Sequence, residues 1–176
     1  MDSITIKTLI AFIVINVTST DFCGLLEDGY KIGPADVDCV VSAAKRQRVP
    51  VNILLAIASV EGGKNGQFVT NTNGSRDLGH FQINTIHWTQ KGLFAAYPLI
   101  TKFDVAWRGC YNAEIAAWIL RIYIEENSTQ DYWTRVANYH SKIPKFNAAY
   151  RKKLIPYAIR WGYWLEQHYN VSVTQK

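Results

Sequence analysis

Residues 51–63 read VNILLAIASVEGG, and this stretch decides the fold. From Val51 to Val60 only Asn52 and Ser59 are polar, so we expect a helix that is buried nearly all round. A proline is tolerated in the first turn of a helix, which suits Pro50, and the two glycines after Glu61 end it. The helix therefore delivers Glu61 into whatever cleft the later segments form.

The placement of Glu61 suggests acid–base chemistry. A carboxyl group at the end of a buried helix loses water on several sides, which disfavours its charged form and raises its pKa. Glu61 is therefore a candidate proton donor near neutral pH. The alternative is an ordinary surface glutamate, but a carboxylate in the last turn faces the negative end of the helix dipole and gains nothing there.

A polar stretch follows the helix. Residues 64–79 are rich in Asn, Gly, Thr and Asp, which indicates turns, with a short strand pair around Phe68-Val69 and Leu78. Asp77 is the nearest second acid, but an aspartate in the run Asn-Gly-Ser-Arg-Asp is more often a turn former than a nucleophile. Only one catalytic carboxylate is obvious.

The rest of the chain is predicted to be mainly helical. Helical spacing occurs over residues 36–48, with Val37, Val40, Val41 and Ala44 on one face, and over residues 111–125, with Ile115, Trp118, Ile119 and Ile122 on one face. Further helices are expected over residues 131–140 and 148–169, and a short helix is expected to begin at Phe81, within residues 81–90. Residues 93–102 read as a loop or irregular helix interrupted by Pro98. Pro156 should bend or split the last helix.

Length and charge limit the function classes. A chain of 176 residues is long enough for one domain with a proper core and too short for two. Its net charge of +5 favours a polyanionic partner, such as nucleic acid, a membrane surface or a bacterial cell wall. The dense basic clusters, residues 45–48 and 150–153, read as solvated helix faces, so we expect no nucleic-acid partner.

The first 20 residues are typical of a secretory signal peptide. Lys7 precedes a mostly apolar run from Thr8 to Val17, and small polar residues follow before Asp21. This run is shorter than the ~20 residues that span a bilayer, so no stable membrane span is expected after cleavage. An uncleaved N-terminal anchor is the alternative, and the residues before Cys23 are a poor match to a lipidation site.

Three short motifs then occur in order: Glu61-Gly62-Gly63, Gly79-His80-Phe81-Gln82 and Ala137-Asn138-Tyr139-His140. They resemble the Glu-Ser-Gly, Gly-Leu-Met-Gln and Ala-Tyr-Asn signatures of the lytic transglycosylases with a goose-lysozyme-like fold. The resemblance covers roughly Asp38 to Tyr150. It is greatest to the small specialised members that accompany conjugation, type IV secretion and related envelope-spanning machines.

The resemblance implies a mainly α, α+β lysozyme-like fold, a single helical domain with a small β-hairpin region beside the active site. It divides the chain into a signal peptide (1–20), a lead segment (21–35), a catalytic domain (36–170) and a tail (171–176). It implies a periplasmic location, peptidoglycan strands as the substrate, and membership of an envelope-spanning complex.

The resemblance also implies a mechanism and a set of site residues. Glu61 protonates the leaving oxygen and, as a carboxylate, then takes the proton of the C6 hydroxyl of the same N-acetylmuramic acid, which closes to a 1,6-anhydro sugar without a cofactor. The implied substrate contacts are Asn73, Ser75, Gly79, Phe81, Gln82, Asn84 and Tyr139. Tyr139 matches the family tyrosine beside the catalytic glutamate, and His80-Phe81 in place of Leu-Met is a departure.

The cysteines follow the same resemblance, since specialised relatives often carry cysteines at the positions of Cys39 and Cys110. We expect these two to form a disulfide in an oxidising periplasm, with Cys23 left over; two unrelated buried thiols are the alternative. No metal site is expected. The four histidines, His80, His87, His140 and His168, lack the usual ligand spacing.

Two other functions compete with the transglycosylase. A lysozyme-type hydrolase would need Asp77 or another acid to position a water molecule. A non-catalytic peptidoglycan-binding component of the same apparatus would not need Glu61, Gln82 and Tyr139 together.

Overall fold

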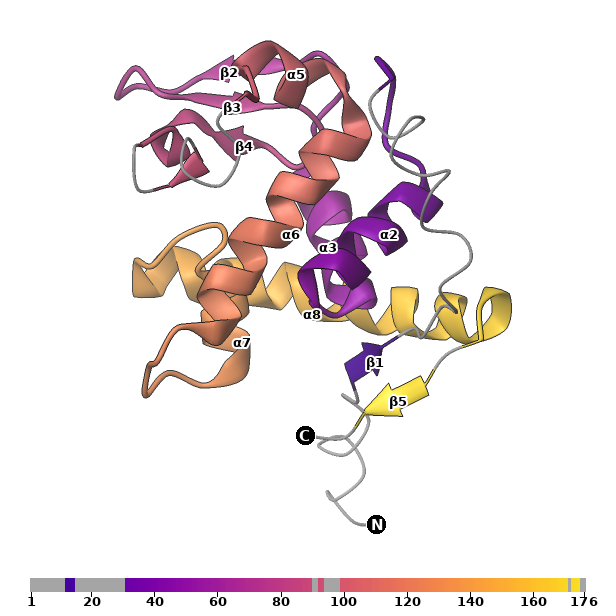
Figure 1. The fold of residues 1–176 in the computed structure, drawn as a ribbon. Helices are drawn as coiled ribbons and strands as arrows, with labels where there is room; N and C mark the ends of the chain where they lie inside the picture. The colour runs from indigo at the N-terminus through magenta and orange to yellow at the C-terminus, as the bar shows by residue number, and fades with distance from the viewer. Residues whose placement is uncertain (1–11, 15–30, 90–91, 94–98, 171, 175–176) are drawn as a thin grey trace.

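The structure is a computed structural model that describes residues 12–14, 31–89, 92–93, 99–170 and 172–174. It is mainly helical, with a small three-stranded antiparallel sheet, and the expected α+β class is therefore confirmed. The sheet and the short helix α5 (Lys102–Trp107) lie at one end of the long helix α6 (Gly109–Glu125), and α7 (Tyr132–Ala137) lies near the other end (Figure 1).

The first two described helices match the expected ones closely. Helix α2 (Val37–Gln47) begins at Asp36, whose carboxylate accepts the N–H of Cys39 at 2.8 Å, and it ends at Arg48, which has a left-handed φ of 56°. Helix α3 (Val51–Glu61) is buried at every position from Val51 to Ala58. Its apolar sequence thus places it at the centre of the core, as predicted.

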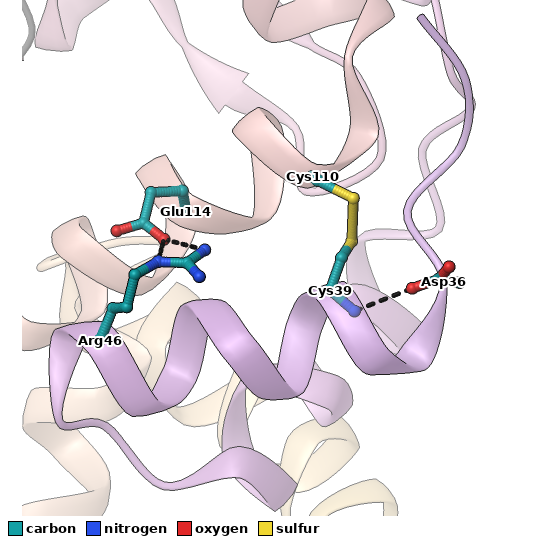
Figure 2. Close-up of a disulfide and its surroundings, with 5 residues drawn as sticks. All are labelled: Asp36, Cys39, Arg46, Cys110 and Glu114. Carbon is teal, nitrogen blue, oxygen red and sulfur yellow. Dashed lines mark hydrogen bonds and ion pairs between the residues drawn. A yellow bond between two sulfur atoms is a disulfide. The ribbon is translucent and has the colours of Figure 1, made fainter. Parts of the chain in front are cut away.

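Helices α2 and α6 pack side by side and are joined by a disulfide and an ion pair (Figure 2). Cys39 and Cys110, 5.5 Å apart between Cα atoms, form the disulfide near the start of both helices. Near the other end of α2, the guanidinium of Arg46 lies 2.8 Å from the Glu114 carboxylate. The expected cysteine pairing is confirmed. Ile122, which the helical spacing placed on the same face as Ile115 and Ile119, is 45% exposed, so that face is only partly buried.

Helix α8 (Pro144–His168) crosses α3 and packs against it more extensively than any other element does. Polar contacts also connect them: the side-chain amide of Asn52 donates to the Ala158 carbonyl at 3.2 Å, the Trp161 indole donates to the Ser59 hydroxyl at 2.9 Å, and a further one, between Tyr150 and Glu61, is described below. Of the bend or split expected at Pro156, the split does not occur, because α8 is continuous through this residue. Pro156 lies on the exposed face, where water can satisfy the carbonyl that loses its helical partner.

The sheet consists of β2 (Phe68–Thr70), β3 (Arg76–Leu78) and β4 (Ile83–Asn84) in that order, with Asp77 opposite Asn84. The expected strand pair around Phe68 and Leu78 is confirmed, and these two residues are direct partners. A helix beginning at Phe81 was a wrong prediction: the chain forms β4 and then a single 3-10 turn, η2 (Thr85–His87).

The ends of the chain meet in a second, two-stranded sheet. Strand β1 (Phe12–Val14) pairs antiparallel with β5 (Ser172–Thr174). The remainder of the expected signal peptide, Cys23 and Pro98 lie outside the described residues. Among the residues that the structure describes, no helix has the length and apolar character needed to cross a membrane.

Candidate active site

Glu61 is the last residue of α3, and the next residue, Gly62, caps the C-terminal end of the helix. Gly62 adopts a left-handed φ of 59° and donates its N–H to the Ala58 carbonyl at 3.0 Å, a conformation that glycine adopts without strain. The Glu61 side chain is 13% exposed, so it stands at the boundary between the buried helix and solvent. This is the placement that the sequence predicted.

Burial raises the pKa of Glu61 from 4.5 to about 7. The hydrogen bond from Tyr150 opposes this rise, the negative charge of Asp77 adds to it, and the positive charge of Lys153 opposes it. A carboxyl group with a pKa near 7 is substantially protonated at neutral pH and can still lose its proton. It is therefore suited to act first as an acid and then as a base.

Tyr150 is the direct partner of Glu61. Its hydroxyl donates to Oε1 of Glu61 at 2.7 Å, and its side chain, which α8 supplies, is 4% exposed. The sequence did not identify this role, because Tyr150, Leu154 and Ala158 at helical spacing indicate only a core face. The contact depends on the crossing of α3 and α8, which no local pattern reveals.

Tyr139, the predicted partner of Glu61, makes a different hydrogen bond. Its hydroxyl donates to the Phe81 carbonyl at 2.9 Å. Burial raises the pKa of Tyr139 well above 10, and the negative charge of Glu61 raises it further, so the two groups interact electrostatically without a shared hydrogen bond. Tyr139 thus anchors the turn that contains Gly79 and Gln82.

That turn lies directly against the end of α3. The N–H of Gly63 donates to the His80 carbonyl at 3.1 Å, and the side-chain amide of Gln82 donates to the Gly79 carbonyl at 2.7 Å. A Cβ atom added at Gly63 would overlap both the Gly79 carbonyl and the Gln82 amide. The structure therefore brings Gly79 and Gln82 beside the end of α3.

Asn112 on α6 holds the same turn from the other side, a role that no local sequence pattern indicates. It is fully buried; its amide donates to the carbonyls of Leu78 (2.8 Å) and Val105 (2.9 Å), and its oxygen accepts the N–H of Phe81 at 2.6 Å. Asn112 also occupies the space next to Gly79, where an added Cβ would lie 2.7 Å from its amide.

Phe81 itself is fully buried, and its ring belongs to the core. This placement does not support the predicted contact between its ring and a substrate. His80, which precedes it, is partly buried, and burial lowers the pKa of its imidazole.

The remaining predicted residues gather on the sheet. Asp77 accepts hydrogen bonds from the amides of Asn71 (3.0 Å) and Asn84 (2.6 Å), and the Ser75 hydroxyl accepts from the same two amides. Asn73 lies in the exposed turn between β2 and β3, where its oxygen accepts the N–H and the hydroxyl of Ser75. Asp77 thus uses both carboxylate oxygens to shape this turn, as expected for a turn former.

His140 lies on the outer side of the Glu61–Tyr150 pair. Its ring stacks on Tyr150 with centroids 4.7 Å apart and planes 2° from parallel, and its Nδ1 is 4.0 Å from Oε1 of Glu61. The site as a whole places the Glu61 carboxyl among aromatic and amide groups, with the negative charge of Asp77 near enough to influence its pKa. Within the described ranges, no cluster of three or more His, Cys, Asp or Glu residues could hold a metal ion.

No protein-family model matches the chain. Over 51 residues the chain is 45% identical to Protein IpgF of Shigella flexneri. The match covers 28% of this chain and 34% of IpgF, so it spans about a third of the relative's length.

Proposed function

We propose that this protein is a peptidoglycan lytic transglycosylase that cleaves the β-1,4 bond between N-acetylmuramic acid and N-acetylglucosamine. The observation that carries the proposal is the state of Glu61: a carboxyl with a pKa of about 7, 13% exposed, at the end of the central helix. The order and spacing of the three motifs around it support the same family.

In the proposed reaction, the protonated Glu61 donates its proton to the glycosidic oxygen as the C1–O bond breaks. The C6 hydroxyl oxygen of the same muramic acid then bonds to C1, and its proton passes to the Glu61 carboxylate. Atoms balance without water, and Glu61 ends protonated. An intramolecular nucleophile has a high effective concentration when the sugar ring is held correctly.

A lysozyme-type hydrolase is the second candidate, because Asp77 is close enough for its charge to raise the pKa of Glu61. Hydrolysis needs a second carboxylate that positions water or attacks C1. The oxygens of Asp77 accept amide hydrogen bonds from Asn71 and Asn84, which favours a structural role over a nucleophilic one. The anhydro product is therefore the preferred outcome.

The setting that we propose is the periplasm, where the enzyme would open the wall locally for a conjugation, secretion or pilus apparatus. The apolar run near the N-terminus and the Cys39–Cys110 disulfide support export to an oxidising compartment. The partial similarity to IpgF of Shigella flexneri supports a bacterial setting.

The test is mass spectrometry of the soluble fragments that the protein releases from purified sacculi, with Glu61→Gln as the matched control. Gln is isosteric with Glu but cannot transfer a proton, so the variant should lose ~10²–10⁴-fold or more of the activity. The wild-type fragments should end in 1,6-anhydro-N-acetylmuramic acid, one water lighter than a hydrolysed end.

Three outcomes are distinct. Anhydro ends that disappear in Glu61→Gln support the transglycosylase. Reducing N-acetylmuramic acid ends would establish the hydrolase instead. Binding to sacculi without any released fragment would make the protein a non-catalytic component and would reject the proposed enzyme.

A further inference from the structure

His140 occupies a position that the proposed reaction does not yet use. It stands where the resembled signature has Asn, and its side chain is 47% exposed, compared with 13% for Glu61 and a nearly buried Tyr150. With its ring stacked on Tyr150 and its Nδ1 4.0 Å from Oε1 of Glu61, it lies between these two residues and solvent.

The backbone around His140 is held in place by buried amides. The N–H of His140 donates to the Ala137 carbonyl at 3.1 Å. The amide of Asn147, on the same helix as Tyr150, donates to the Ser141 carbonyl at 3.1 Å and to the Asn138 side chain at 3.0 Å. These hydrogen bonds connect the His140 turn to α8, the helix that carries Tyr150. They therefore keep the His140 and Tyr150 rings stacked.

The charged groups around His140 favour its neutral form at neutral pH. Burial lowers the pKa of its imidazole, and the positive charge of Lys153 on α8 lowers it further, while the negative charge of Asp77 on β3 opposes both. The groups that face it from α3 and α8 are the carboxyl of Glu61 and the phenol of Tyr150. A positively charged imidazolium would stabilise the carboxylate form of Glu61. A neutral imidazole ring covers the carboxyl without this effect.

We propose that His140 is a positioning residue that closes the solvent side of the Glu61–Tyr150 pair and so holds the Glu61 carboxyl out of water. Its stacked ring covers the contact between the two side chains. Removal of the ring admits water to the carboxyl, which reverses the largest effect that keeps Glu61 protonated. The role in catalysis rests on the proposed function, but the effect on Glu61 does not.

The decisive measurement is the titration of the Glu61 carboxyl by ¹³C NMR, without substrate, in the full chain. His140→Ala and His140→Asn both remove the ring, and the Asn variant keeps a polar side chain of the type found in the resembled signature. His140→Phe restores a flat ring that cannot titrate. His168→Ala is the matched control, because His168 stacks on Trp164 (4.1 Å, 13°) near the end of α8.

We expect the pKa of Glu61 to fall toward 4.5 in His140→Ala and His140→Asn, to return close to its wild-type value in His140→Phe, and to stay unchanged in His168→Ala. In the pH–rate profile, the alkaline limb of the first two variants should move to lower pH, with about a tenfold loss of rate above pH 7 for each unit of that movement. The rate should change little only at pH values below the lowered pKa of Glu61.

An unchanged Glu61 titration in both ring-deleting variants would overturn the proposal, and so would an equal fall in His168→Ala, which would indicate general loosening of the fold. If the wild-type protein releases no fragments from sacculi, the proposed function fails, whereas the titration still decides the role of His140.

Discussion

The Tyr150 hydroxyl donates a hydrogen bond to Oε1 of Glu61 at 2.7 Å and so joins the end of α3 to the first half of α8. The bond stabilises the charged form of the carboxyl, because a donor prefers the carboxylate to the neutral acid. Burial has the larger, opposite effect. The pKa of about 7 is therefore a balance between these two contributions.

The first prediction concerns Tyr150→Phe. Removal of the hydroxyl abolishes the hydrogen bond while burial persists, so the pKa of Glu61 should rise above about 7. The alkaline limb of the pH–rate profile should move to higher pH, the opposite direction to that expected for His140→Ala. A limb that moves to lower pH would show that the hydroxyl does not stabilise the carboxylate.

The second prediction concerns stability and Glu61 itself. Its pKa is raised in the folded protein, so its contribution to stability is fully present below about pH 4.5 and is lost as the pH rises through about 7. The rise corresponds to on the order of 3 kcal/mol. Gln does not titrate, so Glu61→Gln should escape this loss.

Urea unfolding at about pH 4 and about pH 8 measures this effect. Between these two conditions, the wild type should lose on the order of 3 kcal/mol more than Glu61→Gln, because the other titrating groups are common to both proteins. Parallel pH dependence of the two proteins would contradict the raised pKa.

The central helix and the position of Glu61 at its end were predictable because the information is local. Ten residues with two polar positions are typical of a helix that is buried nearly all round, and the glycines at 62 and 63 indicate where the helix ends. The strand pairing of Phe68 with Leu78 followed from turn chemistry in the same way. The disulfide was predicted from a family resemblance, not from the residues themselves.

The missed features all depend on distant contacts. Tyr150 reaches Glu61 across 89 positions, and Asn112 reaches Phe81 across 31, so neither role leaves a periodic signal. Residues 81–90 were expected to begin a helix, but the pairing of β4 with β3 outweighs local preference there. The split expected at Pro156 does not occur, because the cost of a proline within a helix depends on whether the carbonyl that loses its hydrogen bond faces water.

The third prediction addresses Asn112. Asn112→Ala removes the side-chain partner of two backbone carbonyls and one N–H in the core, and each buried group left unsatisfied costs ~1–3 kcal/mol. We expect a loss of at least ~3 kcal/mol in the free energy of unfolding, measured with urea. Asn73→Ala is the exposed control and should change stability by about 0.5 kcal/mol or less. Equal losses in the two variants would contradict the anchoring role of Asn112.

The fourth prediction concerns the disulfide. It closes a loop between residues 71 positions apart, which in the chain-entropy model contributes about 4 kcal/mol. The Cys39→Ser/Cys110→Ser double variant should lose stability of this order, and a reductant should lower the stability of the wild type but not of the variant. Non-reducing peptide mapping that finds either cysteine joined to Cys23 would refute the pairing.

The last prediction separates lyase from hydrolase through Asp77. In Asp77→Asn one of the two amide hydrogen bonds is lost, because the new amide group donates where a carboxylate oxygen accepted, so the turn should weaken only modestly. The negative charge also disappears, which should lower the pKa of Glu61 and move the alkaline limb to lower pH. We expect substantial activity at about pH 5 and unchanged 1,6-anhydro ends. A variant that is folded but inactive at every pH, together with reducing ends from the wild type, would assign Asp77 as the base of a hydrolase, with Glu61 still the acid.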